Sequence, residues 1–287
     1  MTSLPEGAAR RCHNMVNPLH SAVYFSPALG KELAPYGIED RSAVYFAGRA
    51  APLGAASAGT VTATFYNFSH ALVARSVPAV WESASPATVL AARVRAVDTM
   101  LRELLGDEAV SSPEMAEAAG LALKAAEACT RAGRPLYAAN ADLPVPDDPH
   151  LAYWHAATLL REHRGDAHIA VLQSAGLDPL EALVSHTASG RGMAPKWVLS
   201  TRGYNQQDWT AAQERLRERG VLDADGELTA EGTALRKELE ENTDRLDRGP
   251  YEYLGAEGVE RLTELAGGFS AAAANAGAFP GDLFGKG

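Results

Sequence analysis

The densest group of side chains that could do chemistry lies in WHAATLLREHRGDAH, residues 154–168. On a helix, His155 and Glu162 are seven residues apart and therefore share one face. His163 and His168 follow at the end of this stretch, among charged neighbours. Because an imidazole near a carboxylate can exchange protons at neutral pH, these four residues are candidates for general acid–base catalysis or ligand binding.

A structural interpretation of the same side chains stays open. The pattern predicts that one helix ends near residue 164 and that Asp166 caps the next one, so the polar groups could form a hydrogen-bonded network at a helix junction. The spacing of Glu162, His163 and His168 matches no recognised set of metal ligands, so we predict no metal site. Acid–base chemistry of this kind would also need no cofactor, and none is predicted.

A second polar face lies in CHNMVNPLHSAVYF, residues 12–25. His13 and His20 are seven residues apart with Asn17 between them, so a helix would place all three on one side. Polar side chains at a helix–helix contact are costly to bury without partners. We therefore expect this face to meet the cluster at 154–168 or to line a cavity, and His20 joins the candidate catalytic residues.

Composition narrows the class of protein. The chain has 287 residues, 46% of them hydrophobic, and a net charge of −10, which repels nucleic acid and anionic membranes unless a local basic patch overrides it. Cys12 and Cys129 are too few for a disulfide scaffold and are interpreted as reduced thiols. The N-terminus has no apolar signal core and no stretch reaches about 18 apolar residues, so we expect a cytoplasmic protein without a membrane span.

The two halves of the chain align with each other. When Gly37 is placed on Gly176, residues 24–50 lie over 163–189 at a constant offset of 139, and Tyr-Asn pairs at 66 and 204 follow at 138. The alignment predicts two repeats, 1–140 and 141–287, which pair internally so that the protein is a monomer. The alternative is that two alanine-rich helical stretches align by chance.

Periodicity and stop signals predict a mainly helical chain. Helices are expected at about 8–25, 27–35, 39–50, 57–64, 68–80, 85–105, 113–132, 150–164, 166–175, 178–187, 194–201, 206–219, 230–247 and 256–267. The proline-rich segment 140–149 is expected to be a linker, and VLDADGELTAEG at 221–232 has the Asp-Gly turn of a β-hairpin. The tail at 270–287 is expected to be poorly ordered or to lie on the surface.

Residues 195–232 resemble the winged helix-turn-helix of MarR-type regulators. They contain a short helix, a turn at Gly203, a long helix ending in RLRERG, the predicted hairpin as a wing, and LTAEG at the start of the next helix. The whole chain resembles an actinobacterial family of tandem, MarR-related proteins. This resemblance implies a duplicated MarR-like winged helix-turn-helix fold, an internal pseudo-dimer with one β-hairpin wing, in the second repeat.

The resemblance also implies two sites. In a winged helix, the helix at 206–219 would enter the DNA groove and present Gln206, Gln207 and Arg215. However, residues 206–248 contain 12 acidic and 7 basic residues, a local charge of −5, and the wing DADGE has no base, so DNA binding is disfavoured.

MarR-type proteins hold ligands between the dimerisation helices and the winged core. The corresponding residues here are Tyr24, Phe46, Arg49, Phe65, Tyr66 and Phe68.

Three functions therefore compete. The negative net charge and the lack of basic residues in the predicted wing favour a small-molecule-binding protein or an enzyme of specialised metabolism, with its pocket at the seam between the repeats. The helix-turn-helix outline favours a ligand-responsive transcriptional regulator that binds DNA through the helix at 206–219. A scaffold for protein interactions is the third. Whether the protein is an enzyme, and on what substrate, does not follow from the sequence.

Overall fold

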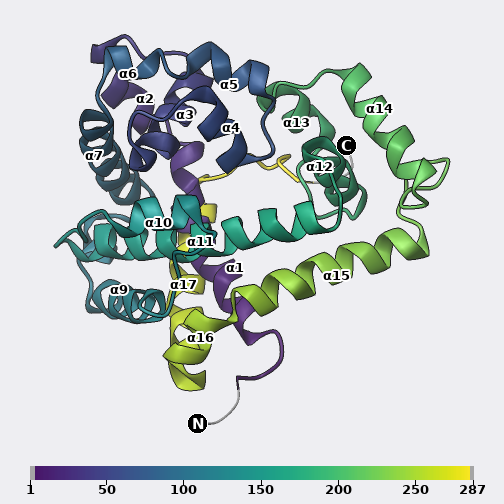
Figure 1. Ribbon diagram of the computed structural model, residues 1–287. Coiled ribbons are helices and arrows are strands. Elements are labelled where there is room, and N and C mark those ends of the chain that lie inside the picture. Colours follow the sequence, from purple (N-terminus) through teal and green to yellow (C-terminus); the bar gives the residue numbers. More distant parts are fainter. Residues whose placement is uncertain (1–3, 285–287) are drawn as a thin grey trace.

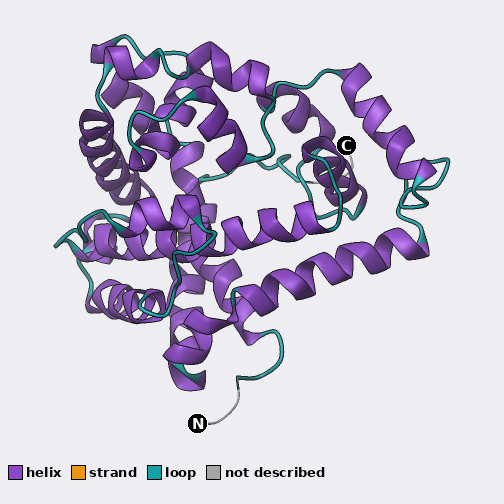
Figure 2. Cartoon of the chain, viewed as in Figure 1, coloured by secondary structure: helices purple, strands orange, loops and turns teal. Residues whose placement is uncertain are grey.

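The computed structural model describes residues 4–284, which form helices joined by short loops (Figures 1 and 2). The first half contains α1 (Ala8–Ser21), α2 (Ala28–Leu33), α3 (Arg41–Ala50), α4 (Ala58–Phe65), α5 (His70–Ser76), α6 (Val80–Ser83), α7 (Pro86–Leu105), α8 (Asp107–Val110), α9 (Pro113–Ala126) and α10 (Pro135–Ala141). The second half contains α11 (Pro149–Ser174), α12 (Pro179–Ala188), α13 (Pro195–Thr201), α14 (Gln206–Glu218), α15 (Ala230–Leu246), α16 (Arg248–Leu254) and α17 (Ala256–Asn275). No helix of this described part is long and apolar enough to cross a membrane.

The predicted β-hairpin wing is wrong, because residues 4–284 contain no β-strand. Between α14 and α15 only Leu222 and Leu228 form an isolated antiparallel bridge. The carboxylate of Asp223 accepts the backbone N–H groups of Asp225 and Glu227, both at 2.9 Å. Two backbone bonds also cross the turn, from Asp223 N–H to the Glu227 carbonyl at 2.9 Å and from Thr229 N–H to the Val221 carbonyl at 3.1 Å, but this pairing is too short to form a strand. The fold is therefore mainly α, without a wing.

The predicted break near residue 165 is also wrong, because α11 runs without interruption through 26 residues. Asp166 does cap a helix, but not its own. Its carboxylate accepts the backbone N–H groups of Leu136 and Tyr137, at 3.1 and 2.9 Å, at the N-terminus of α10. The side chain expected at a junction along the chain thus forms a contact between two helices distant in sequence.

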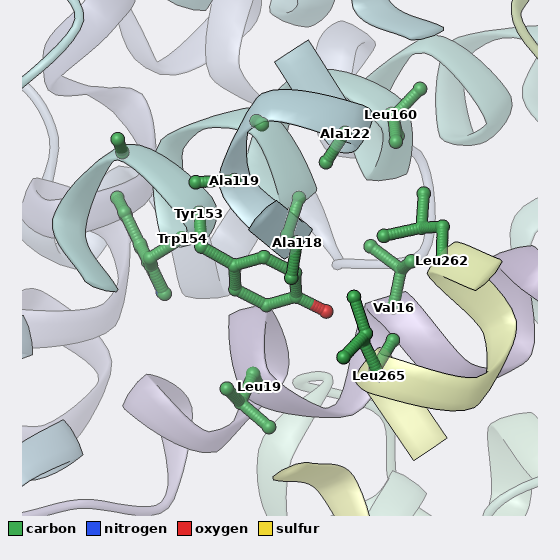
Figure 3. Packing of buried hydrophobic residues seen from close by; sticks show 14 of the residues in the cluster. Val16, Leu19, Ala118, Ala119, Ala122, Tyr153, Trp154, Leu160, Leu262 and Leu265 are labelled. Carbon is green, nitrogen blue, oxygen red and sulfur yellow. The ribbon is translucent and has the colours of Figure 1, made fainter. Parts of the chain in front are cut away.

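The main hydrophobic core surrounds α11 and is formed with α1, α9 and α17 (Figure 1). Figure 3 shows the fully buried Tyr153 among Val16, Leu19, Ala118 and Leu265, side chains from three other helices. Because α11 is buried on nearly every side, it has no single apolar stripe, and it serves as the axis of the molecule.

Two further cores lie above α11 in Figure 1 and define two heads. The first head is α2 to α6 and the second is α12 to α14. They are in contact: the Tyr66 hydroxyl donates to the Leu177 carbonyl, and the Ser69 N–H donates to the Arg202 carbonyl at 2.9 Å. Gly203 has φ 76°, and a Cβ there would lie 2.4 Å from Ser69 Oγ, so both its conformation and this contact require glycine. The division into repeats 1–140 and 141–287 and the monomeric state stay predictions.

Of the two alternatives expected for the C-terminal segment, the poorly ordered one does not describe it up to residue 284. Helix α17 continues to Asn275, and the following residues pass between the heads to α13 (yellow in Figure 1). The Leu283 carbonyl accepts the N–H of Ala194 at 3.0 Å, and Asp282 accepts the indole N–H of Trp197 at 3.2 Å. The segment up to residue 284 is therefore part of the structure; residues 285–287 of the predicted tail lie outside the described range.

Candidate ligand-binding cavity

A cavity of about 1080 Å³ lies between the first head, the middle of α11, α13 and the C-terminal segment. Pockets for drug-sized ligands have volumes of about 300–1000 Å³, so a small organic molecule would fit. Its walls are rich in aromatic side chains: Tyr24, Phe25, Tyr45, Phe46, Phe68, Trp154, Trp197, Phe279 and Phe284.

One wall contains a hydrogen-bonded chain of Thr158, His20 and Tyr24. Thr158 donates its hydroxyl proton to the Trp154 carbonyl at 2.9 Å, so its oxygen accepts from His20 Nδ1, also at 2.9 Å. His20 Nε2 then has no proton and accepts the Tyr24 hydroxyl at 3.0 Å. Burial lowers the pKa of His20 to about 3, so the ring is neutral at pH 7. Both of its nitrogens are occupied by protein.

A buried ion pair joins the first head to α11. Arg49 Nε and Nη2 donate to the two carboxylate oxygens of Glu162 at 3.3 and 3.0 Å, and Arg49 Nη1 donates to the Tyr45 hydroxyl at 3.1 Å. Burial alone would raise the pKa of Glu162, but Arg49 and the nearby Arg161 outweigh it and hold the pKa at about 2. Glu162 is therefore ionised and already neutralised by its partner.

Two other arginines of the cavity, Arg93 and Arg202, are shielded from solvent and form no ion pair with an acidic side chain of the described residues. The buried Arg93 donates to the Gly48 carbonyl at 3.2 Å and to Asn140 at 3.4 Å, and its Nε has no acceptor. Arg202 donates to the Thr201 hydroxyl and to a methionine sulfur. Burial lowers the pKa of Arg93 to about 10, although Tyr24 and Glu162 act in the opposite direction, and burial together with the nearby Arg49 lowers the pKa of Arg202.

The structure brings together some of the predicted site residues and separates others. Those that line the cavity are His20, Tyr24, Phe46, Arg49, Phe68 and Glu162. Phe65 lies behind this wall, where its ring supports the Arg49 guanidinium at 4.4 Å. Tyr66 is used in the contact between the heads.

The three remaining histidines of the cluster lie elsewhere on α11. His163 Nδ1 is 2.7 Å from Asp247, and His168 Nδ1 is 2.9 Å from the Thr243 hydroxyl of α15. Consecutive residues of a helix are about 100° apart around its axis, so a continuous α11 places His163 away from its neighbour Glu162. His155 is buried near Arg93 but does not line the cavity. The predicted cluster therefore does not converge on one site.

Several cavity residues have no local signal in the sequence. Arg202, Trp197 and Phe279 come from segments that meet only through the fold. Arg93 is different, because it follows Val89 and precedes Ala96 on the apolar face of α7, and all three are buried. An arginine in an apolar stripe is unusual and could have indicated a buried polar site.

The surface of α14 is the other candidate site. Gln206 and Gln207 are exposed at its N-terminus. Arg215, however, is bound to Asp178 at 2.6 Å and to Glu181 at 3.0 Å within the second head. The neighbouring arginines, at 217 and 219, are likewise engaged with Glu214 and Glu181. The cations of this helix are therefore occupied by the protein's own carboxylates.

The fold thus defines a helical protein with a helix-turn-helix element, formed by α13, the turn at Gly203 and α14, and with a cavity beside it. The chain belongs to a helix-turn-helix family, and the sequence model of that family matches residues 9–280. Helix-turn-helix elements place their second helix in the major groove of DNA, so DNA enters as a candidate partner. No curated protein and no solved structure matches the chain.

Proposed function

We propose that this protein binds a small organic molecule in the cavity between its two heads. The observation that carries the proposal is the cavity itself, whose volume of about 1080 Å³ is lined by aromatic side chains together with arginines and other polar groups. Ligand pockets have this composition: apolar surface supplies affinity, and a small number of oriented polar groups supplies specificity.

Binding is supported better than acid–base catalysis. A general base needs a free lone pair at a suitable pKa. His20 uses both ring nitrogens, and Glu162 is held by Arg49 in a bidentate pair. These groups are suited to fixing the wall of a pocket. The kinship with MarR-type regulators belongs to the same proposal, and it is supported by the turn at Gly203 and the helix that follows.

The proposal is tested by filling the cavity. Gly30 lines it, and a Cβ at this position meets no atom within 4 Å, so Gly30→Phe would place a ring in open space. We expect wild-type protein to enhance the fluorescence of the neutral apolar probe N-phenyl-1-naphthylamine, and the variant to bind it about tenfold more weakly, since the ring occupies the space of the ligand.

The matched control is Gly120→Phe on α9, an equally open position outside the cavity. It should bind the probe as the wild type does, while thermal melts verify that both variants fold. Wild-type protein that does not enhance probe fluorescence, or a Gly30→Phe variant that binds it equally well, would contradict the proposed function.

DNA binding is the second candidate function, favoured by the family and by the exposed amides of Gln206 and Gln207. Because the arginines of α14 are paired, we expect no affinity for random duplex DNA stronger than about 10⁻⁴ M in low-salt buffer. Fluorescence polarisation with a labelled duplex measures this. Micromolar binding that weakens steeply with added salt would instead establish DNA as a partner.

A further inference from the structure

We infer that the ligand of the cavity is an organic anion, whose carboxylate or phosphate head is bound by Arg93, with Arg202 adding positive charge to the same cavity, and whose apolar body lies against the aromatic walls. This inference rests on the proposed function, because it names the ligand class of the same cavity.

The charges that line the cavity are unbalanced. Five arginines, at positions 41, 49, 93, 161 and 202, face only two glutamates, Glu39 and Glu162, in a chain whose net charge is −10. Glu162 is bound by Arg49 with both of its oxygens. The excess of three positive charges is therefore local and opposite in sign to the molecule as a whole, which favours the entry of an anion into this site.

The two unpaired arginines carry the argument further. Arg93 is 7% exposed, and neither it nor Arg202 forms an ion pair with a carboxylate of the described residues. A buried charge is costly without a counter-charge. Arg93 also has a buried Nε–H with no acceptor. A carboxylate or phosphate supplies the missing counter-charge, and it matches the planar fork of a guanidinium.

Aromatic rings hold both guanidinium groups in place. Arg93 lies 5.3 Å from the centre of the Trp154 ring, and Arg202 lies 4.4 Å from that of Phe68. Such stacking fixes the orientation of a guanidinium before the ligand arrives and leaves its edge available for hydrogen bonds. Phe279 and Leu283 of the C-terminal segment add apolar wall for the body of the ligand.

The test compares ligands that differ only in their head group. We would titrate the full-length protein by calorimetry with 1-naphthaleneacetate, 1-naphthyl phosphate and neutral 1-naphthaleneacetamide. At least one anion is expected to bind about tenfold or more tightly than the amide, because only an anion makes charge-assisted bonds to Arg93 in the positive field of the cavity. The tighter of the two anions identifies the head group.

Variants locate the effect. Arg93→Met keeps the length of the side chain and removes the charge, so the preference for the anion should fall to about onefold to threefold, since the charge-assisted bonds are lost. Arg202→Met should also reduce the preference for the anion. Because this position is less buried, the variant keeps the test informative if Arg93→Met does not fold. The control is Arg95→Met, on the same helix, where the arginine is exposed and pairs with Glu32 outside the cavity.

The outcomes separate this inference from the proposed function. Enhanced N-phenyl-1-naphthylamine fluorescence together with equal affinity for amide and anions would overturn the anion assignment and leave the binding function in place. A preference for anions that survives in both arginine variants would also overturn it. Absence of binding by the neutral probe and by all three naphthalene ligands would overturn both. Loss of the preference in the arginine variants, with the control unchanged, supports it.

Discussion

Glu162→Gln is expected to lower the free energy of unfolding by about 3 kcal/mol, because it leaves the Arg49 charge in a buried site without its partner. Both side chains are nearly inaccessible, with exposed fractions of 2% for Glu162 and 11% for Arg49. The pair also connects the first head to α11, so its loss affects packing between elements distant in the chain. Urea denaturation followed by circular dichroism measures the change.

Two controls test the cause of this loss. Glu264→Gln removes a carboxylate that pairs with Arg261 on the exposed surface of α17, and its unfolding should be unchanged within error. The double variant Arg49→Met/Glu162→Leu replaces the pair with apolar side chains and should recover most of the stability, since no charge is left uncompensated. A Glu162→Gln protein as stable as the wild type would show that the pair does not stabilise the fold.

Stability is expected to fall steeply as the pH drops from about 6.5 to about 4. Burial lowers the pKa of His20 to about 3, and burial with help from Arg93 lowers that of His155 to about 4. Below pH 6.5 the unfolded chain binds protons at these two positions while the folded protein does not, so protonation favours unfolding. At pH 5 each contributes a loss of about 2 kcal/mol, or about 4 kcal/mol together, a large part of a typical stability.

The measurement is urea denaturation at pH 7, 6 and 5. His20→Gln and His155→Gln should each remove about 2 kcal/mol of the loss between pH 7 and pH 5, whatever they do to stability at pH 7, since each removes one buried histidine with a lowered pKa. The remaining dependence comes from His13, His168 and His186, whose pKa values burial also lowers. Glu162 adds little over this range, because its stabilisation is complete above the ordinary pKa of about 4.5 and is lost only as the pH falls toward its folded value of about 2. A stability that is equal at pH 7 and pH 5 would contradict the burial of neutral histidines.

Local chemistry in the sequence predicted the helical character and many helix starts. Ser57, Ser69, Ser85 and Thr229 each accept a backbone N–H at the start of a helix, which is the ordinary role of these residue types. The wing was mispredicted because the segments on the two sides of the Asp-Gly turn pair only over a single bridge, between Leu222 and Leu228, and then pass directly into α14 and α15.

The site was only partly predictable, for a reason that is physical. Helix α11 is surrounded by other elements, so its apolar residues follow no 3.6-residue period, and the polar groups at 162–168 suggested a junction where the helix in fact continues. His20 and Glu162 could be placed near the seam from their spacing. The pairing of Glu162 with Arg49, and the positions of Arg93 and Arg202, depend on contacts between distant segments, which no local pattern specifies.

The central claim, that the cavity between the heads binds a small organic anion, is tested most directly by a crystal structure of the protein grown with 1-naphthaleneacetate. The predicted result is ligand density inside the cavity, with the carboxylate about 3 Å from a nitrogen of Arg93 and the naphthalene ring against the aromatic walls. An empty cavity, or a ligand found only on the outer surface of a protein saturated with it, would contradict the account.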